Sequence, residues 1–300
     1  MSQGFGLFLK LASVGFILSM QSLIKTLEGA LPPTEVVFFR AFLSIPFLLV
    51  WIGGQGRLHV VLKTENLRGN LMRGLMGACA MSLTFAAISY LPLPEATALF
   101  FFAPILTTIF AVIFLKERVR LIRVSAVVAG LIGVLVILWP QLGGVAGASD
   151  EAAAQRSLGA MLALGAACFM AAAKILVRRL VGRDHPSTVV LYAALTASAA
   201  ALLTLPFGWL WPTGPQWTVL FGAGCLGAVG QALLTTAYKY ADASTIAPFD
   251  YSSMIFAILF GYLFFSELPS LQTLIGAGIV IAAGGVILWR EAQVRGSTPS

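Results

Sequence analysis

Asp250 lies inside an apolar run that is long enough to cross a lipid bilayer. The run covers residues 243–265 and reads ASTIAPFDYSSMIFAILFGYLFF. A charge at mid-membrane depth costs at least about 2.5–3.5 kcal/mol, so such a residue normally faces a wet cavity or a partner of opposite charge. Lys174 and Arg40 also lie inside apolar runs. These three side chains are therefore the first candidates for contact with a polar ligand.

Lys174 and Asp250 are expected to form an ion pair. A helix rises about 1.5 Å per residue, and by this measure both residues lie roughly 10 Å from the predicted cytoplasmic face. We expect the pair to close the cytoplasmic end of a cavity in one state, and to bind the carboxylate and ammonium of a substrate in another. The alternative role is a permanent ion pair that only fixes two helices together. Transport by neutral variants of each residue distinguishes the two roles.

Further residues are expected to line the same cavity. Arg40 offers a rigid fork for a carboxylate near the depth of Gln21, and anchoring its helix against the first helix is its alternative role. Aromatic rings would form a wall that suits an aromatic or aliphatic substrate side chain. The remaining candidates are the aromatic Phe100, Phe101 and Tyr251 and the polar Ser82 and Gln231.

Two prolines are expected to bend the helices that carry these side chains. Pro104 and Pro248 each fall within an apolar run. Proline removes a backbone hydrogen bond from a helix, so each is expected to shape the cavity or to act as a hinge.

The elements that must position these residues are membrane-spanning helices. The chain is 59% hydrophobic and 10% charged, against roughly 45–50% apolar and about 25% charged in a soluble domain. About 20 apolar residues are needed for each crossing, and the sequence contains ten such runs. They lie near residues 5–27, 34–52, 70–90, 94–115, 121–139, 158–181, 187–208, 217–239, 244–265 and 270–290, and the longest joint is 140–157.

Basic residues predict the orientation of these helices. If the chain starts inside, the inner loops and helix ends hold fourteen lysines and arginines, and the outer loops hold two, Lys25 and Arg156. Cytoplasmic loops carry an excess of Lys and Arg. Both termini are therefore predicted to be cytoplasmic, in a multi-pass protein of the bacterial inner membrane.

The two halves of the chain repeat each other. A shift of 150 residues aligns 69–139 with 219–289 without a gap, including Gly77 with Gly227 and Glu117 with Glu267. A shift of 153 aligns PTEVVFF, from Pro33, with PSTVVLY, from Pro186. Each half has five predicted helices, and an odd number requires the second copy to enter the membrane from the opposite face. The expected fold is an all-α membrane protein with ten transmembrane helices in two inverted repeats, 1–148 and 149–300, around a central cavity.

The charged candidates do not follow this repeat. Asp250 corresponds to Phe100, Lys174 to Gln21 and Arg40 to Ala193. This asymmetry favours a role in ligand polarity or gating. Glu117 and Glu267 recur in both halves, which favours a structural role at the membrane surface, so they are left out of the predicted site.

Several kinds of chemistry have no support in the sequence. It contains no G-x-x-x-x-G-K-[ST] phosphate loop and no clustered metal-ligand motif. His59 and His185 lie in predicted loops, away from any buried nucleophile. We therefore expect no enzyme activity, cofactor, metal or nucleic-acid partner. The expected partners are a small-molecule substrate and the lipid bilayer, with a monomer preferred and an oligomer left open.

Two blocks carry a family resemblance. The blocks ATALFFFAPILTTIFAVIFLKERVRLIRVSAVVAGLIGVLVIL and STIAPFDYSSMIFAILFGYLFFSELPSLQTLIGAGIVIAAGGVIL, within the layout of five plus five helices, resemble the EamA branch of the drug/metabolite transporter superfamily. The resemblance implies alternating access and transport of small metabolites. Length and pattern look closest to the YddG-type amino-acid exporters, including those for aromatic amino acids. The Asp-Tyr pair after APF also resembles relatives that import vitamins or carboxylates, and a membrane enzyme or platform is a third alternative.

Overall fold

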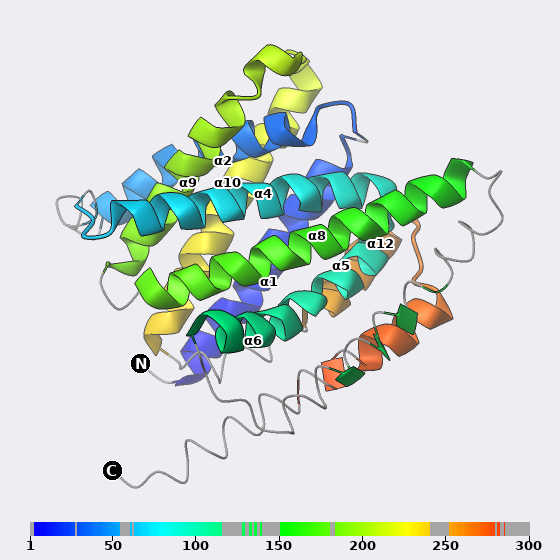
Figure 1. The fold of residues 1–300 in the computed structure, drawn as a ribbon. Coiled ribbons are helices and arrows are strands. Elements are labelled where there is room, and N and C mark those ends of the chain that lie inside the picture. Colours follow the sequence, from blue (N-terminus) through cyan, green and yellow to red (C-terminus); the bar gives the residue numbers. More distant parts are fainter. Residues whose placement is uncertain are drawn as a thin grey trace, which may run out of the picture.

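The fold is that of a helical bundle, seen in a computed structural model (Figure 1). The structure describes residues 3–27, 29–54, 61, 63–115, 151–180, 184–240 and 252–279, together with single positions and pairs in 128–139 and 281–285. Every regular element in this described part is a helix. The helices are α1 (Gln3–Lys25), α2 (Pro33–Gly53), α4 (Leu67–Tyr90), α5 (Leu93–Phe100), α6 (Phe102–Leu115), α8 (Glu151–Leu180), α9 (Pro186–Leu202), η1 (Leu205–Phe207), α10 (Gly214–Tyr240) and α12 (Ser252–Phe265).

Five of the described helices are long and apolar enough to span a bilayer. The spans are Gly4–Lys25, Pro33–Gly53, Leu67–Tyr90, Ala154–Val177 and Gly214–Leu234. Shorter apolar helices include Ser187–Leu202 and Ser252–Phe265. The chain is therefore an all-α, multi-pass membrane protein. The predicted run 121–139, the start of the run 244–265 and the end of the run 270–290 lie largely outside the described residues.

The predicted helix 94–115 is interrupted in the structure. It is divided into α5 and α6 at Phe101, which has φ −64° and ψ −8°. Pro104 follows three residues later, and it has no N–H to bond the carbonyl oxygen of Phe100, which lies four residues before it. The break therefore lies where the missing hydrogen bond predicts it.

Two other predicted boundaries were wrong. The sixth run was predicted to start near residue 158, after the joint 140–157, but α8 begins at Glu151. Its first residues are EAAAQRS, and alanine, glutamate and glutamine favour a helix. The run 187–208 was predicted as one helix, but α9 ends at Leu202 and a short 3₁₀ turn follows. Pro206 in that turn disfavours the helical conformation of the residue before it.

Helix packing follows the sequence repeat. By the two sequence shifts, α1 corresponds to α8, α2 to α9 and α4 to α10. In the structure, α1 packs against α10, and the corresponding helices α8 and α4 pack against each other in the same way (Figure 1). The contact of α2 with α10 is likewise matched by that of α9 with α4. Each half of the chain therefore packs its first two helices on the third helix of the other half.

The core lies where these helices converge. Its fully enclosed side chains include Val37 on α2, Ile88 on α4, Leu99 on α5, Ala163 on α8 and Leu220 on α10. Because every one of these helices contributes to one apolar cluster, the two halves share a core instead of forming separate ones.

The glycines of α10 allow its closest packing. A Cβ atom added at Gly224, Gly227 or Gly230 would lie 2.9 Å from the nearest side-chain atom of α1 or α2. Ser13 on α1 also donates a hydrogen bond to the carbonyl oxygen of Gly230 at 2.7 Å. Other helices therefore approach α10 closely at these glycines.

Asp184 joins the turn between α8 and α9 to the segment before α4. Its carboxylate accepts hydrogen bonds from Thr64 Oγ1 at 2.7 Å, from the backbone N–H of Glu65 at 2.9 Å and from Asn70 Nδ2. Burial opposes ionisation, but these hydrogen bonds outweigh it and hold the pKa of Asp184 below its ordinary value of 3.8.

Asp184→Ala is expected to destabilise the protein by about 1–3 kcal/mol, because the buried amide of Asn70 loses a charged acceptor. Since the folded-state pKa is lowered, the stabilisation is present above pH 4 and is lost as the pH falls through the folded-state value. Thermal unfolding of the purified protein at neutral and acidic pH measures both effects. Glu65→Ala is the control, because it keeps the backbone donor and removes only an exposed side chain. Equal melting temperatures for Asp184→Ala and Glu65→Ala would contradict the assignment.

Candidate functional site

Arg40 is the central charged residue of the candidate site. It lies on α2, and its side chain is only 9% exposed. Its Nε lies 3.3 Å from the Sδ of Met20 on α1, and its Nη1 lies 3.1 Å from the Sδ of Met81 on α4. A Cβ atom added at Gly227 on α10 would lie 2.9 Å from Nε and from Nη2. The guanidinium therefore sits where α1, α2, α4 and α10 meet.

No described carboxylate neutralises this guanidinium. The described acidic residues all lie at helix ends or joints, and they are Glu35, Glu65, Glu95, Glu151, Asp184 and Glu267. Glu35 is on the same helix as Arg40, but its Oε2 accepts a hydrogen bond from the backbone N–H of Leu210 at 3.0 Å. Thioether sulfur is a weak acceptor. Arg40 thus has donor capacity that the described part of the protein leaves unused.

Three of the predicted site residues are sequence neighbours of residues that lie next to the Arg40 guanidinium. Gln21 follows Met20 on α1, Ser82 follows Met81 on α4, and Gln231 lies one turn after Gly227 on α10; all three are half-buried. Arg40 was predicted to contact a substrate or to anchor α2 against α1. Its contacts reach both α1 and α4, so it is positioned for either role.

Other predicted residues lie elsewhere. Phe100 and Phe101 are at the break between α5 and α6, where Phe101 is buried in the main core and Phe100 packs against it. Lys174 is exposed on α8. Asp250, Tyr251 and Pro248 lie outside the described residues, as does the side chain of Pro104. The ion pair of Lys174 with Asp250 therefore stays a prediction.

A charged cluster that the sequence did not predict joins three helix ends. We call it the Lys25 cluster, after the last residue of α1. Lys25 Nζ lies 2.9 Å from Glu267 Oε1 and donates a hydrogen bond to the carbonyl oxygen of Leu91 at 2.7 Å. The other carboxylate oxygen, Glu267 Oε2, accepts a hydrogen bond from the backbone N–H of Leu93 at 2.9 Å. The cluster thus connects α1, the joint between α4 and α5, and the end of α12.

The Lys25 cluster has an unusual backbone conformation beside it, an aromatic contact and a partly buried ion pair. Ser266, just before Glu267, has φ 55°, which is uncommon for a residue other than glycine. The Lys25 ammonium also lies 5.4 Å from the ring centre of Phe265. The side chains of Lys25 and Glu267 are 11% and 21% exposed. An ion pair that is largely withdrawn from water is screened less by salt than one on the surface.

Three charged residues of these sites were not among the predicted site residues. Glu267 was assigned to the membrane surface because it recurs in Glu117, and Lys25 was counted only as an outer-loop residue. Arg73 was counted as an inner basic residue, but it lies in the second turn of α4 with a buried Nε that has no hydrogen-bond partner. The position of Arg73 along α4 could have marked it as a candidate site residue, because it is six residues past the start of the helix.

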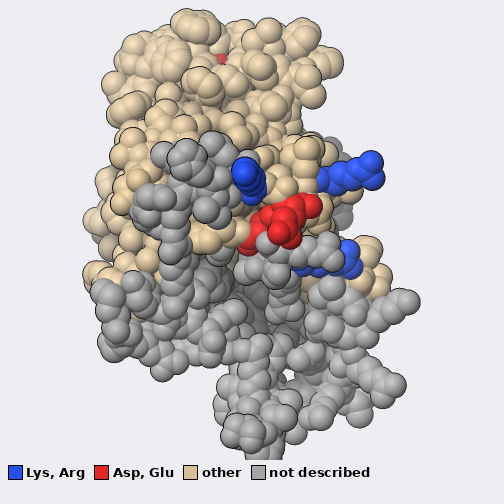
Figure 2. All heavy atoms as spheres, turned by 90° about the vertical axis from the view of Figure 1, so that its left-hand side faces the viewer, with Lys and Arg blue, Asp and Glu red and all other residues tan. Residues whose placement is uncertain are grey.

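Charged side chains of the described part are unevenly distributed. Figure 2 shows most of the basic and acidic side chains of the drawn face gathered in one region, next to a large surface that is almost entirely uncharged. Such an uncharged surface is expected where lipid covers a protein.

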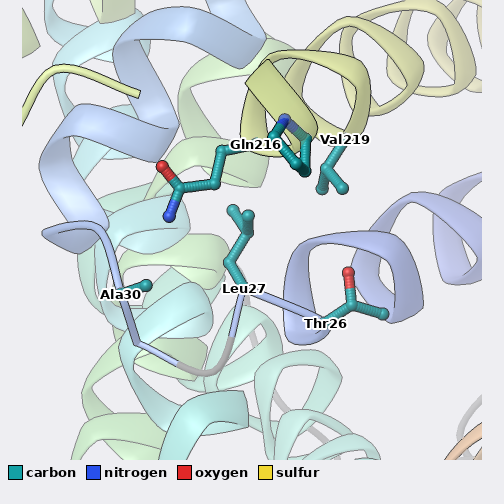
Figure 3. A pocket seen from close by; sticks show the side chains of 6 residues that line it. Thr26, Leu27, Ala30, Gln216 and Val219 are labelled. Atoms are coloured by element: carbon teal, nitrogen blue, oxygen red, sulfur yellow. The ribbon is translucent and has the colours of Figure 1, made fainter. Parts of the chain in front are cut away.

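Two cavities lie near helix ends. One of about 370 Å³ lies between the end of α1 and the start of α10, where Thr26, Leu27 and Ala30 face Gln216 and Val219 (Figure 3). The other, of about 710 Å³, is an aromatic groove whose lining includes Phe38, Phe39, Trp209, Trp211 and Trp217. Trp211 is 79% exposed, as expected of a tryptophan at the boundary between lipid and water. The aromatic lining of the groove, with Trp209, Trp211 and Trp217, is of the kind that occurs at such a boundary.

Gly227→Val is expected to reduce any activity that depends on Arg40 by about tenfold or more, since the added side chain would occupy the position of the guanidinium. Activity and melting temperature of the purified variant are the two measurements. Gly214→Val is the control, because nothing lies within 4 Å of a Cβ at Gly214. Full activity in Gly227→Val would show that the position of Arg40 is unimportant.

Comparison with known proteins identifies related chains. The model of the EamA-like transporter family matches residues 4–139 and 157–289. A riboflavin transporter of Vibrio cholerae is 29% identical over 270 residues, covering 89% of this chain and 87% of the relative. The pseudopaline exporter CntI of Pseudomonas aeruginosa is 29% identical over 265 residues, covering 88% and 89%. An S-adenosylmethionine uptake transporter of Rickettsia felis is 30% identical over 284 residues, covering 93% and 92%.

A solved crystal structure has a similar fold. It superposes with a TM-score of 0.63 and 18% sequence identity, covering 95% of this chain and 97% of the solved chain. At this identity the similarity concerns the fold alone.

Proposed function

Since the chain belongs to the EamA-like transporter family, we propose that it takes up a small vitamin-type or carboxylate-bearing metabolite by alternating access. As a member of this family, the protein is a secondary transporter of small metabolites and not an enzyme. The substrate, the direction and the mechanism are the proposed parts.

The substrate proposal differs from the amino-acid export expected from the sequence. The relatives compared above are named for riboflavin, pseudopaline and S-adenosylmethionine, and none of these three names specifies an amino acid. Uptake is proposed because the relative with the highest identity of these three is an uptake transporter. The buried guanidinium of Arg40 supports a substrate with strong hydrogen-bond acceptors.

The single observation that supports the proposed mechanism is that the first helix of each half packs on the third helix of the other half. Because α1 packs on α10 as α8 packs on α4, the same contacts occur twice in one bundle. Two inverted repeats of this kind permit two related packings, with a central site opened first to one side and then to the other. The two family matches support repeats at 1–148 and 149–300, each with five transmembrane helices.

The Lys25 cluster is proposed to close one end of this pathway. With both termini in the cytoplasm, the end of α1 faces outside, so the protein is closed there. Lys174 and Asp250 are proposed to act at the cytoplasmic end.

Counterflow in proteoliposomes tests the function. Purified protein is reconstituted with unlabelled compound inside, and entry of the labelled compound is followed. Riboflavin, S-adenosylmethionine, nicotinate and phenylalanine make up the panel. Accumulation of any of the first three, without phenylalanine, is the expected result. Accumulation of phenylalanine alone would restore amino-acid transport, and no accumulation of any compound would contradict the proposal.

A further inference from the structure

Arg73 provides a second cation close to Arg40. The Nη1 of Arg73 lies 3.5 Å from the position of a Cβ at Gly77, on its own helix α4. The Nη1 of Arg40 contacts Met81, four residues further along α4. Residues four apart lie on the same face of a helix, about 6 Å apart along its axis. The two guanidiniums therefore occupy neighbouring turns on one face of α4.

These two positive charges act on each other, and none of the described carboxylates pairs with either of them. The positive charge of Arg73 acts electrostatically on Arg40. In the described part of the chain, the Arg40 side chain has hydrogen-bond partners only in the two thioether sulfurs, and the buried Nε of Arg73 has no acceptor. Two uncompensated like charges within a membrane bundle are costly. A bound anion would remove that cost.

The repeat argues against a role in the scaffold. Arg40 and Arg73 correspond to Ala193 and Ala223 in the second half, and both alanines are buried. Gly77 and Gly227, the two glycines next to the guanidiniums, correspond to each other. The second half thus builds the same packing without either cation.

We propose that Arg40 and Arg73 together bind one anionic oxygen-bearing group of the transported metabolite, a carboxylate or a phosphate. The inference rests on the proposed transport function and narrows its substrate to an anion. Each guanidinium offers several N–H donors, so one carboxylate or phosphate that lies between the neighbouring turns marked by Gly77 and Met81 can accept hydrogen bonds from both arginines. Arginine suits this role because its planar fork matches both groups.

Matched compounds test the charge requirement. The full-length protein in detergent is titrated with nicotinate and nicotinamide, phenylalanine and phenylalaninamide, and riboflavin 5′-phosphate and riboflavin, and binding is read from the melting temperature. Each pair differs in the anionic group. At least one pair is expected to favour the anion by about tenfold or more in Kd. The pair that responds distinguishes a carboxylate from a phosphate. No preference in any pair overturns the inference.

Arg73→Met tests the assignment of the residue. It is expected to reduce the anion preference to about twofold or less, and to raise the melting temperature of the ligand-free protein by removing an uncompensated charge. Arg68→Met, on the same helix and exposed, is expected to change neither value. An unchanged preference in Arg73→Met, or a lowered melting temperature of its ligand-free form, overturns the role of Arg73.

The binding and counterflow measurements can contradict the anion site and the transport function independently of each other. Counterflow of a neutral compound, without anion preference, would keep the proposed transport and defeat the anion site. Anion binding that depends on Arg73, without counterflow of any compound, would keep the site and defeat the proposed transport.

Discussion

Arg40→Gln is expected to reduce counterflow by about 30- to 150-fold, because loss of a charged hydrogen bond to a buried ligand costs roughly 2–3 kcal/mol. The guanidinium of Arg40 is buried among α1, α2, α4 and α10, and its hydrogen-bond acceptors among the described residues are thioether sulfurs. Glutamine keeps a long polar side chain, so the change removes chiefly the charge. Initial rates of labelled-substrate entry into proteoliposomes measure the effect.

Arg40→Lys distinguishes the contribution of the planar pair of guanidinium donors from that of the positive charge. Lysine keeps the positive charge but lacks the planar donor pair, so it is expected to recover only a part of the activity. Arg156→Gln, which removes an exposed charge from α8, controls for a general effect of charge on insertion. A wild-type counterflow rate in Arg40→Gln, together with a lowered melting temperature, would assign Arg40 to anchoring α2 and exclude it from the substrate site.

The helices could be predicted because apolar length is a strong signal in a membrane. The bounds of α1, α2, α4 and α10 lie within three residues of the predicted runs. A bend near Pro104 was expected from its missing N–H, although the run 94–115 was predicted as one helix. The early start of α8 was not predicted, since apolar length carries no information about the helix propensity of a polar segment. The close packing of α10 was predictable because glycine spacing has a direct steric meaning.

The site could be predicted only in part. The depth of Arg40 along α2 follows from helical rise, but the neighbours of its side chain depend on which helices pack together. Met20 and Met81 are ordinary apolar residues in the sequence, and nothing marks them as contacts of a guanidinium. Arg73 was left out of the predicted site because the positive-inside rule counts basic residues near a helix end without asking whether they are buried.

The Lys25 cluster shows a different limit of sequence analysis. Lys25 and Glu267 are near opposite ends of the chain, and their backbone partners Leu91 and Leu93 carry no polar side chain. Recurrence of Glu267 in Glu117 was interpreted as evidence of a structural role. In an inverted repeat, however, recurrence is equally expected of a gate, since each half closes one end.

Cross-linking Lys25→Cys to Glu267→Cys with a short bifunctional thiol reagent is expected to reduce counterflow by about tenfold or more, since alternating access requires this end to open. The pair is 2.9 Å apart at its charged atoms and joins α1 to α12. The three native cysteines, Cys79, Cys168 and Cys225, are free thiols and are replaced by alanine beforehand. Counterflow of the same preparation before and after treatment measures the effect.

Two controls distinguish the effect of closing this end of the protein from the effect of chemical modification alone. Each single-cysteine variant treated with the same reagent carries the modification but no cross-link, and is expected to retain the rate it had before treatment. A cleavable reagent is expected to restore the rate of the double variant when it is cut. A cross-linked protein that exchanges substrate at its untreated rate would exclude the Lys25 cluster as a gate and leave it a structural contact.

The repeat extends the same argument to the opposite end. The two sequence shifts relate Lys25 to Arg178 and Glu267 to Glu117, so a basic and an acidic residue again correspond. Glu117 and the side chain of Arg178 lie outside the described residues, and the correspondence is one of sequence. If the halves exchange roles, a cross-link between cysteines at these positions traps the opposite state. Substrate would then reach Arg40 from the outer side only, whereas the Lys25–Glu267 cross-link leaves access from the inner side only.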